Sequence, residues 1–195
     1  FVNGKRLGIY SNVESIKPEF LKRSFGTSKG ACYEGTLADF YEDRINRFQA
    51  KTKKKKRIKK GRAKLLKIAR ILQQMKKDKN SKPLEKHINI DDFMKFWAVE
   101  SLVGFWDGYS SNQNNFYIFL HPQDKKFYFI PWGADSAFTE RRFMIFMDKY
   151  KSVNARGLLA NRLYADPVAR LKYRDTLVTI LKDHWNEEEL LKELD

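Results

Sequence analysis

The chain has 195 residues, of which 42% are hydrophobic and 14% aromatic, so it can bury a core and is not intrinsically disordered. Its single cysteine, Cys32, excludes an intramolecular disulfide, and three scattered His without a Cys/His cluster argue against a structural zinc site. The net charge is +15, and residues 49–86 hold 17 of the 39 basic but only 2 of the 24 acidic residues. The rest is neutral, so we interpret residues 49–86 as a basic insert.

The chain begins at Phe1, on what we interpret as the end of a strand. Asn3 and Gly4 predict a two-residue hairpin turn, with residues 7–13 as the returning strand. We therefore expect one domain over residues 1–195 whose N-terminal part is missing. The sequence contains no signal peptide and no membrane-spanning apolar run.

The next elements follow from apolar spacing and turn residues. Residues 16–25 predict a short helix with Pro18 in its first turn, residues 31–35 a strand, and residues 37–48 a loop and a helix. The run KTKKKKRIKK, from Lys51 to Lys60, is so densely charged that we expect it to be mobile rather than packed. Residues 62–77 predict a helix, with apolar residues recurring three and four positions apart.

A third helix is capped by Asn89 or Asp91, and we expect Glu100 to be buried near its apolar stripe with a hydrogen-bonding partner. Residues 116–120 and 127–130 predict a hairpin. Helices are then expected at 158–164, from the Asp166-Pro167 cap to Leu181 or His184, and at 187–194. This order predicts an α+β fold with a small sheet region and a larger helical lobe.

Polar residues stand at both ends of the predicted hairpin. Asp107 and Asn112 have the spacing DxxxxN, Asn115 precedes the first strand, and Asp135 follows the second. Phosphoryl transfer to a hydroxyl needs a carboxylate that orients the nucleophile, and an amide oxygen and a second carboxylate that hold magnesium. The structural alternatives are that Asp107 caps a turn and that Asp135 caps a helix from Ser136 onward.

Several motifs together resemble the CotH family, spore coat protein H and its relatives, which are atypical protein kinases. They are Gly8-Ile9-Tyr10 with Glu14, Phe20-Leu21-Lys22-Arg23, Tyr33-Glu34-Gly35, Phe96-Trp97-Ala98 with Glu100, Trp106-Asp107-Gly108-Tyr109, Asn114-Asn115-Phe116-Tyr117 and Ile130-Pro131-Trp132-Gly133-Ala134-Asp135. The resemblance implies a kinase-like fold, ATP with Mg²⁺ or Mn²⁺, and transfer to Ser or Thr of a protein substrate. It also implies a spore-coat, cell-surface or other extracytoplasmic location.

The resemblance assigns roles residue by residue. Asp107 would be the catalytic aspartate, Asp135 a metal ligand with Asn112 or Asn115 as co-ligand, and Glu14 a cofactor-binding residue paired with a lysine that is missing from this chain. Many relatives have Asp where this chain has Gly133, and Lys where it has Glu34. The alternative is an inactive pseudokinase or a surface or coat binding module. The segment from Lys51 to Lys60 is then either a solvated insert without function or a contact for a polyanion, which could be an acidic protein, nucleic acid or an anionic surface.

Overall fold

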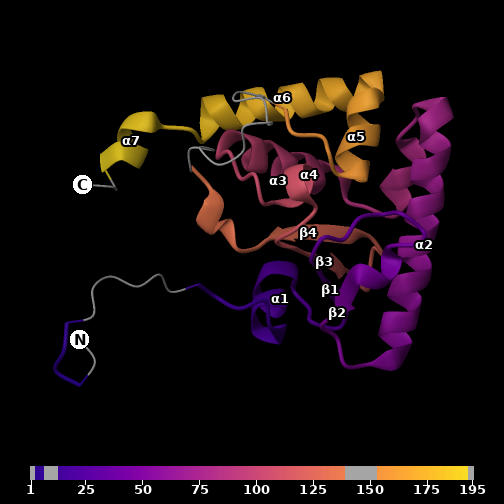
Figure 1. Ribbon diagram of the computed structural model, residues 1–195, viewed down its shortest axis with the longest axis horizontal. Coiled ribbons are helices and arrows are strands. Elements are labelled where there is room, and N and C mark those ends of the chain that lie inside the picture. The colour runs from indigo at the N-terminus through magenta and orange to yellow at the C-terminus, as the bar shows by residue number, and fades with distance from the viewer. Residues whose placement is uncertain (1–2, 7–12, 139–152, 193–195) are drawn as a thin grey trace.

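The computed structural model describes residues 3–6, 13–138 and 153–192 (Figure 1). Its α-helices are α1 (Pro18–Phe25), α2 (Lys55–Asp78), α3 (Ile90–Leu102), α4 (Tyr109–Asn112), α5 (Leu158–Ala165), α6 (Pro167–Asp183) and α7 (Glu187–Lys192). Its strands are β1 (Ala31–Gly35), β2 (Phe48–Ala50), β3 (Phe116–Leu120) and β4 (Phe127–Pro131), and short 3₁₀ helices cover Ile45–Arg47, Lys82–Lys86 and Ala134–Ser136. The predicted α+β class is confirmed.

The four strands form an antiparallel sheet in the order β2-β1-β3-β4. Strand β1 pairs with β3 from Ala31 opposite Leu120 to Gly35 opposite Phe116, so the chain segments beyond Gly35 and before Phe116 meet at one end of the sheet. The predicted β1 and hairpin strands are confirmed. The loop and helix expected over residues 37–48 are present as a loop and the 3₁₀ helix Ile45–Arg47, while β2, which begins at Phe48, was not predicted.

The sheet separates two apolar clusters because successive strand side chains point to opposite faces. Alternate β3 residues, Phe116, Ile118 and Leu120, join the main core with α2, α3, α5 and α6, while Tyr117 and Phe119 pack against α1 and the buried thiol of Cys32. Figure 1 shows α3, α5 and α6 on one side of the sheet and α1 on the other. All five β3 residues are buried, which makes β3 the central support of the fold.

Helix α2 starts at Lys55, seven residues before the predicted helix, so the expectation of an unpacked run is wrong for residues 55–60. The Tyr33 hydroxyl donates to the Ile58 carbonyl at 2.7 Å, and a Cβ at Gly61 would lie 2.3 Å from that hydroxyl oxygen. These contacts fix the first two turns on β1 despite their charge. The helix then buries Leu65, Ile68, Ala69, Leu72 and Met75 in the main core.

The helical layer covers one face of the sheet. In α3 the buried Trp97 stacks on Tyr173 of α6, with ring centroids 3.7 Å apart. Asn89 caps α3 by accepting from the Asp92 backbone N–H, and Asp166 caps α6 by accepting from that of Val168, as the sequence indicates. Across the described ranges, no helix is both long enough and apolar enough to cross a membrane.

Other sequence predictions fall partly outside these ranges. Asn3 and Gly4 both have positive φ, which agrees with the predicted turn, while the expected strand at 7–13 and the end of the last helix at 194 lie mostly or wholly outside the described residues. Gly26 ends α1 with a φ of 69°, as its position after the apolar run predicts.

Candidate active site

The Asp107 loop connects α3 to β3. Helix α3 ends at Leu102, Gly104 adopts a φ of 61°, and the chain then turns through Asp107 into the single turn of α4. After α4, Gln113 and Asn115 both have left-handed backbones, with φ of 54° and 50°, and β3 begins at the next residue. These reversals fold the loop back on itself, so its polar side chains converge.

Three asparagine amides surround the half-buried carboxylate of Asp107. Asn112 Nδ2 donates to Oδ1 at 2.6 Å, Asn115 Nδ2 donates to Oδ2 at 2.7 Å, and Asn114 Nδ2 lies 3.3 and 3.4 Å from the two oxygens. Asn114 also accepts from the Leu37 backbone N–H through its own oxygen, at 3.4 Å. Both ends of the Asn114 amide are therefore occupied within the protein, so its role is to shape the loop.

Asn115 links Asp107 to the Asp135 segment. While its Nδ2 donates to Asp107, its Oδ1 faces Gly133: a Cβ built at Gly133 would lie 3.4 Å from Asn115 Oδ1 and 3.6 Å from Asp135 Oδ1. The Asn115 carbonyl also accepts from the Trp132 backbone N–H at 3.1 Å, which joins the start of β3 to the end of β4. Asp107, Asn115 and Asp135 therefore lie at one end of the hairpin.

Asp135 is exposed and lies within the 3₁₀ helix Ala134–Ser136, whose N-cap is Gly133 with a φ of 56°. Its predicted alternative role, capping a helix from Ser136 onward, is wrong, because Asp135 itself belongs to the helical turn. The described residues contain no group of three His, Cys, Asp or Glu side chains placed to hold a metal. The donors that do converge are carboxylate and amide oxygens, which suit Mg²⁺ or Mn²⁺ retaining several waters.

Glu100 supports the loop from below, as the sequence indicates. It is 2% exposed, and its Oε1 and Oε2 accept from the backbone N–H groups of Tyr109 at 2.9 Å and Ser110 at 2.8 Å. A Cβ at Gly108 would lie 2.3 Å from Glu100 Oε1, so only glycine allows this approach. Burial raises the pKa of Glu100 to about 7, against the opposing effect of these hydrogen bonds.

A second buried carboxylate, Asp39, was missed by sequence reasoning. Its Oδ1 accepts from the Tyr109 hydroxyl at 3.0 Å and its Oδ2 from the Leu158 backbone N–H at 2.8 Å, while the Tyr109 hydroxyl accepts from the Leu159 N–H at 3.0 Å. Burial raises the pKa of Asp39. These bonds tie the loop to the start of α5. No sequence signal marks Asp39, since it stands alone in a loop.

Glu14 and Glu34 lie elsewhere. Glu14 forms an exposed ion pair with Arg23 of α1, and this hydrogen bond lowers the pKa of Glu14. Among the described residues, no hydrogen bond or ion pair joins Glu14 to the Asp107 loop. Glu34 pairs with Lys51 at 2.5 Å and accepts from the Tyr117 hydroxyl at 2.9 Å.

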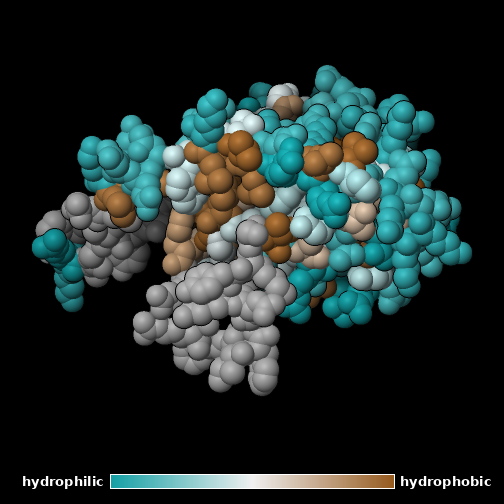
Figure 2. All heavy atoms as spheres, turned by 90° about the horizontal axis from the view of Figure 1, so that it is seen from above, coloured by the Kyte–Doolittle hydropathy of each residue, from teal (hydrophilic) through white to brown (hydrophobic). Residues whose placement is uncertain are grey.

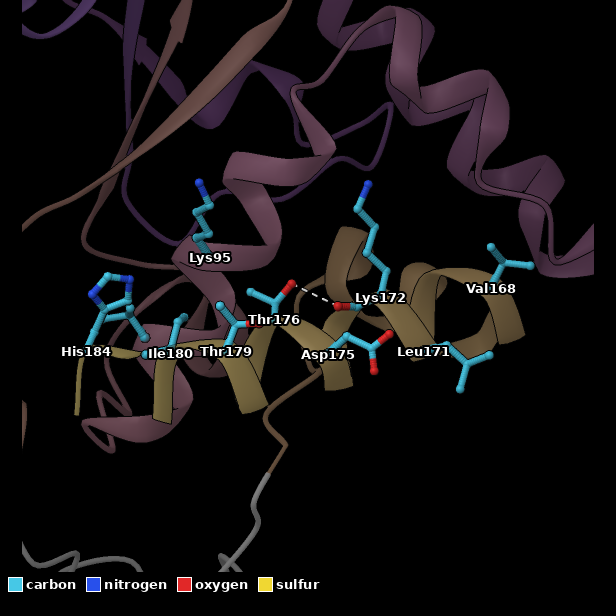
Figure 3. Close-up of a pocket in the computed structure, with 10 residues that line it drawn as sticks. Lys95, Val168, Leu171, Lys172, Asp175, Thr176, Thr179, Ile180 and His184 are labelled. Carbon is cyan, nitrogen blue, oxygen red and sulfur yellow. Dashed lines mark hydrogen bonds between the residues drawn. The ribbon is translucent and has the colours of Figure 1, made fainter. Parts of the chain in front are cut away.

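An apolar groove of about 780 Å³ lies between α3 and α6 (Figure 3). Val99, Val168 and Leu171 line it and are 46%, 76% and 51% exposed. Figure 2 shows the hydrophobic side chains gathered on this face of the molecule. No residue that lines the groove comes from the Asp107 loop or the Asp135 segment, so it is separate from the candidate active site.

The chain belongs to the CotH family, because the family model described as CotH kinase protein matches residues 1–195. It is 27% identical over 116 residues to spore coat protein homolog 1 of Rhizopus delemar, and 26% identical over 120 residues to invasin CotH7 of the same organism. Each match covers 56% of this chain and 19% or 20% of the relative, so the chain spans about a fifth of the length of these relatives.

Proposed function

We propose that this chain is a kinase-like domain that transfers the γ-phosphoryl group of ATP to a Ser or Thr hydroxyl of a protein, with Mg²⁺ or Mn²⁺ as cofactor. The observation that carries the proposal is the convergence of Asp107, Asn115 and Asp135 at one end of the β3–β4 hairpin. Membership of the CotH family supports it.

In this proposal the Asp107 carboxylate orients the acceptor hydroxyl and takes its proton as the hydroxyl oxygen bonds to the γ-phosphorus. The bond from that phosphorus to the bridging oxygen breaks, and ADP leaves. The amides of Asn112, Asn114 and Asn115 fix the direction of the Asp107 oxygens. Asp135 and the Asn115 oxygen would hold the divalent ion, which would supply charge neutralisation for the phosphates.

Labelled-phosphate transfer from ATP, with Mg²⁺ and with Mn²⁺, tests the proposal on the full-length protein. Asp107→Ala and Asp135→Ala should each abolish transfer to protein substrates and to the protein itself. Asp43→Ala is the matched control, since Asp43 is exposed and lies outside the site, and it should retain full activity. Transfer that survives both site variants would refute the proposal.

A second candidate is a binding module that holds nucleotide without turnover. It is favoured by the small number of carboxylates at the site: among the described residues, no group of three His, Cys, Asp or Glu side chains could hold a metal. In that case ATP with Mn²⁺ raises the melting temperature of the full-length protein, but no ADP forms. Efficient turnover would exclude this candidate.

The names of the relatives support a coat or cell-surface location, which we include in the proposal. We also include contact with a polyanion through the exposed cations between Lys51 and Lys60. Retention on heparin that falls steeply with salt would support this contact. Retention unchanged after these exposed lysines are replaced by Gln would refute it.

A further inference from the structure

A small basic cavity lies at the end of the sheet opposite the Asp107 loop. Its volume is about 120 Å³, and it is lined by the ends of β1 and β3, where Ala31 pairs with Leu120, together with the start of α2. The Asp107 loop meets the sheet at the other end of this pairing, where Gly35 lies opposite Phe116. The cavity is therefore separate from the candidate active site.

Four cationic side chains reach this cavity from three elements. Lys29 precedes β1, Arg57 and Lys60 come from the first two turns of α2, and Lys125 comes from the β3–β4 turn. Gly30 makes the approach of Lys29 possible, because a Cβ at Gly30 would lie 2.2 Å from the Leu120 carbonyl oxygen. Segments distant in the sequence thus contribute four basic residues to the lining of one small cavity.

One carboxylate lies near the cavity: Asp124 Oδ1 is 3.4 Å from Nδ1 of His121, which also lines it. None of the four cations has a carboxylate within 4.0 Å among the described residues. Asp124, the acidic residue of the same turn, accepts from the Tyr128 hydroxyl at 2.5 Å and from the Lys126 backbone N–H at 2.9 Å. Helix α2 also begins without a side-chain cap and without an acid in its first turn, so its positive dipole end adds to the field.

The effect of the surrounding cations is seen in two neighbouring groups. The pKa of His87 is lowered to about 4, by burial first and then by Lys64, Lys67 and Lys86. Burial also lowers the pKa of Lys64, Asp124 opposes this shift, and Lys67, Lys125 and Lys60 lower the pKa further. This face of α2 is thus strongly positive, and a bound anion would relieve the repulsion among its cations.

The size and charge of the cavity indicate its ligand. A volume of 120 Å³ is about that of four waters at roughly 30 Å³ each, which fits one tetrahedral oxyanion. A phosphate monoester carries about −1.5 to −2 charges, which suits a small cavity lined by four basic residues. The diester phosphates of nucleic acid carry one charge each along a track, and no Phe, Tyr or Trp is among the described residues lining the cavity for base stacking.

We propose that this cavity binds the phosphate group of a phosphorylated Ser or Thr on a peptide segment. Arg57 supplies a planar fork of donors that can hold two phosphate oxygens, and Lys29, Lys60 and Lys125 surround the group as point charges. The proposal does not require that the chain itself transfers phosphate, because its ligand is already phosphorylated and its residues lie outside the Asp107 loop.

Fluorescence anisotropy of the full-length protein tests this site. The probe is a labelled peptide of neutral sequence with one central phosphoserine, and the same peptide with serine serves as reference. Arg57→Gln combined with Lys60→Gln should weaken binding of the phosphopeptide at least tenfold, on the order expected for loss of charged hydrogen bonds. Lys76→Gln combined with Lys77→Gln makes the same charge change about 28 Å along α2 and should leave affinity within about twofold.

A second pair, Lys29→Gln with Lys125→Gln, tests the same cavity from outside α2 and guards against a folding defect in the first pair. Asp107→Ala should bind the phosphopeptide as the unchanged protein does, so this result is independent of kinase activity. Equal affinity for the two peptides would overturn the proposal. Duplex DNA serves as a competitor for the bound phosphopeptide. If the cavity pairs and the control pair lose the same affinity, and DNA competes more strongly than the phosphopeptide does, the site is a general polyanion surface and the proposal is overturned.

Discussion

Glu100, which is 2% exposed, accepts a hydrogen bond from the backbone N–H of Tyr109 at 2.9 Å. Tyr109 lies two residues after the candidate catalytic Asp107. A buried carboxylate of α3 therefore fixes the start of α4, and α4 in turn holds Asn112 against Asp107. The geometry of the candidate site depends on a titratable group beneath it.

The first prediction concerns the pH dependence of stability. The pKa of Glu100 is about 7 in the folded protein against an ordinary value of 4.5. Between pH 4.5 and 7, the folded state therefore keeps a proton that the unfolded state has lost. The contribution of Glu100 to the free energy of unfolding is fully present below pH 4.5 and falls as the pH rises towards 7. The full shift corresponds to about 3 kcal/mol.

Urea unfolding of the protein and of Glu100→Gln, at several pH values from 4.5 to 8, measures this effect. The free energy of unfolding of the unchanged protein should fall more steeply with pH than that of the variant. Asp39, whose pKa is also raised by burial, is present in both proteins and cancels in the difference. Parallel curves would show that Glu100 does not titrate in this window.

The second prediction separates the asparagines. Asn115→Gly should raise the Mn²⁺ concentration needed for ATP to stabilise the protein by about tenfold or more, because the amide oxygen that lies beside Gly133 is lost. Glycine is chosen because Asn115 has a φ of 50°. Gln113→Gly, at a φ of 54°, is the matched control and should leave the thermal shift unchanged. An effect from Asn112→Gly instead would identify Asn112 as the ligand.

The third prediction restores a family feature. Gly133→Asp should tighten Mn²⁺ binding on the order of tenfold, since a carboxylate there would lie beside Asn115 and Asp135. Gly133→Asn is the control, because both residues tolerate the φ of 56° better than most and only Asp adds charge. Isothermal titration calorimetry compares the two. Equal affinities would place the metal away from Gly133.

The fourth prediction tests whether α2 belongs to the core. Leu72 is fully buried in the main core, so Leu72→Ala should lower the free energy of unfolding by about 2–5 kcal/mol. Lys76→Ala, exposed on the same helix, should change it by less than about 0.5 kcal/mol. Urea titrations give both values, and a small loss for Leu72→Ala would mean that α2 is a detachable insert.

Periodicity in the sequence predicted most helices and the β3–β4 hairpin, because their apolar residues repeat at the spacing of the element. It did not reveal β2, which has only three residues and no visible alternation. The density of charge led to a start for α2 that was too late. In the structure, Tyr33 contacts Ile58 and Gly61 and holds this segment in the helix despite the repulsion among its lysines. Such contacts depend on Tyr33, a residue from another element, and cannot be read from the segment itself.

The candidate site divides in the same way. Asp107, Asn115 and Asp135 were identified from their order and their motifs, and the structure brings them together. The sequence could not separate the roles of the asparagines, because these depend on the direction of each side-chain amide. It could not reveal the role of Asp39 either, because that role depends on the position of α5 beside Tyr109. Glu14 was predicted near the cofactor by resemblance, but it pairs with Arg23 on the surface.

The single thiol of this chain lies against the α1 side of the sheet, and burial raises the pKa of Cys32 to about 12. At neutral pH almost none of it is thiolate, the form that reacts with maleimides and oxidants. A cysteine introduced at an exposed position would therefore be the one that reacts with a spectroscopic label. Cys32 can stay in place while such a reporter follows nucleotide or phosphopeptide binding.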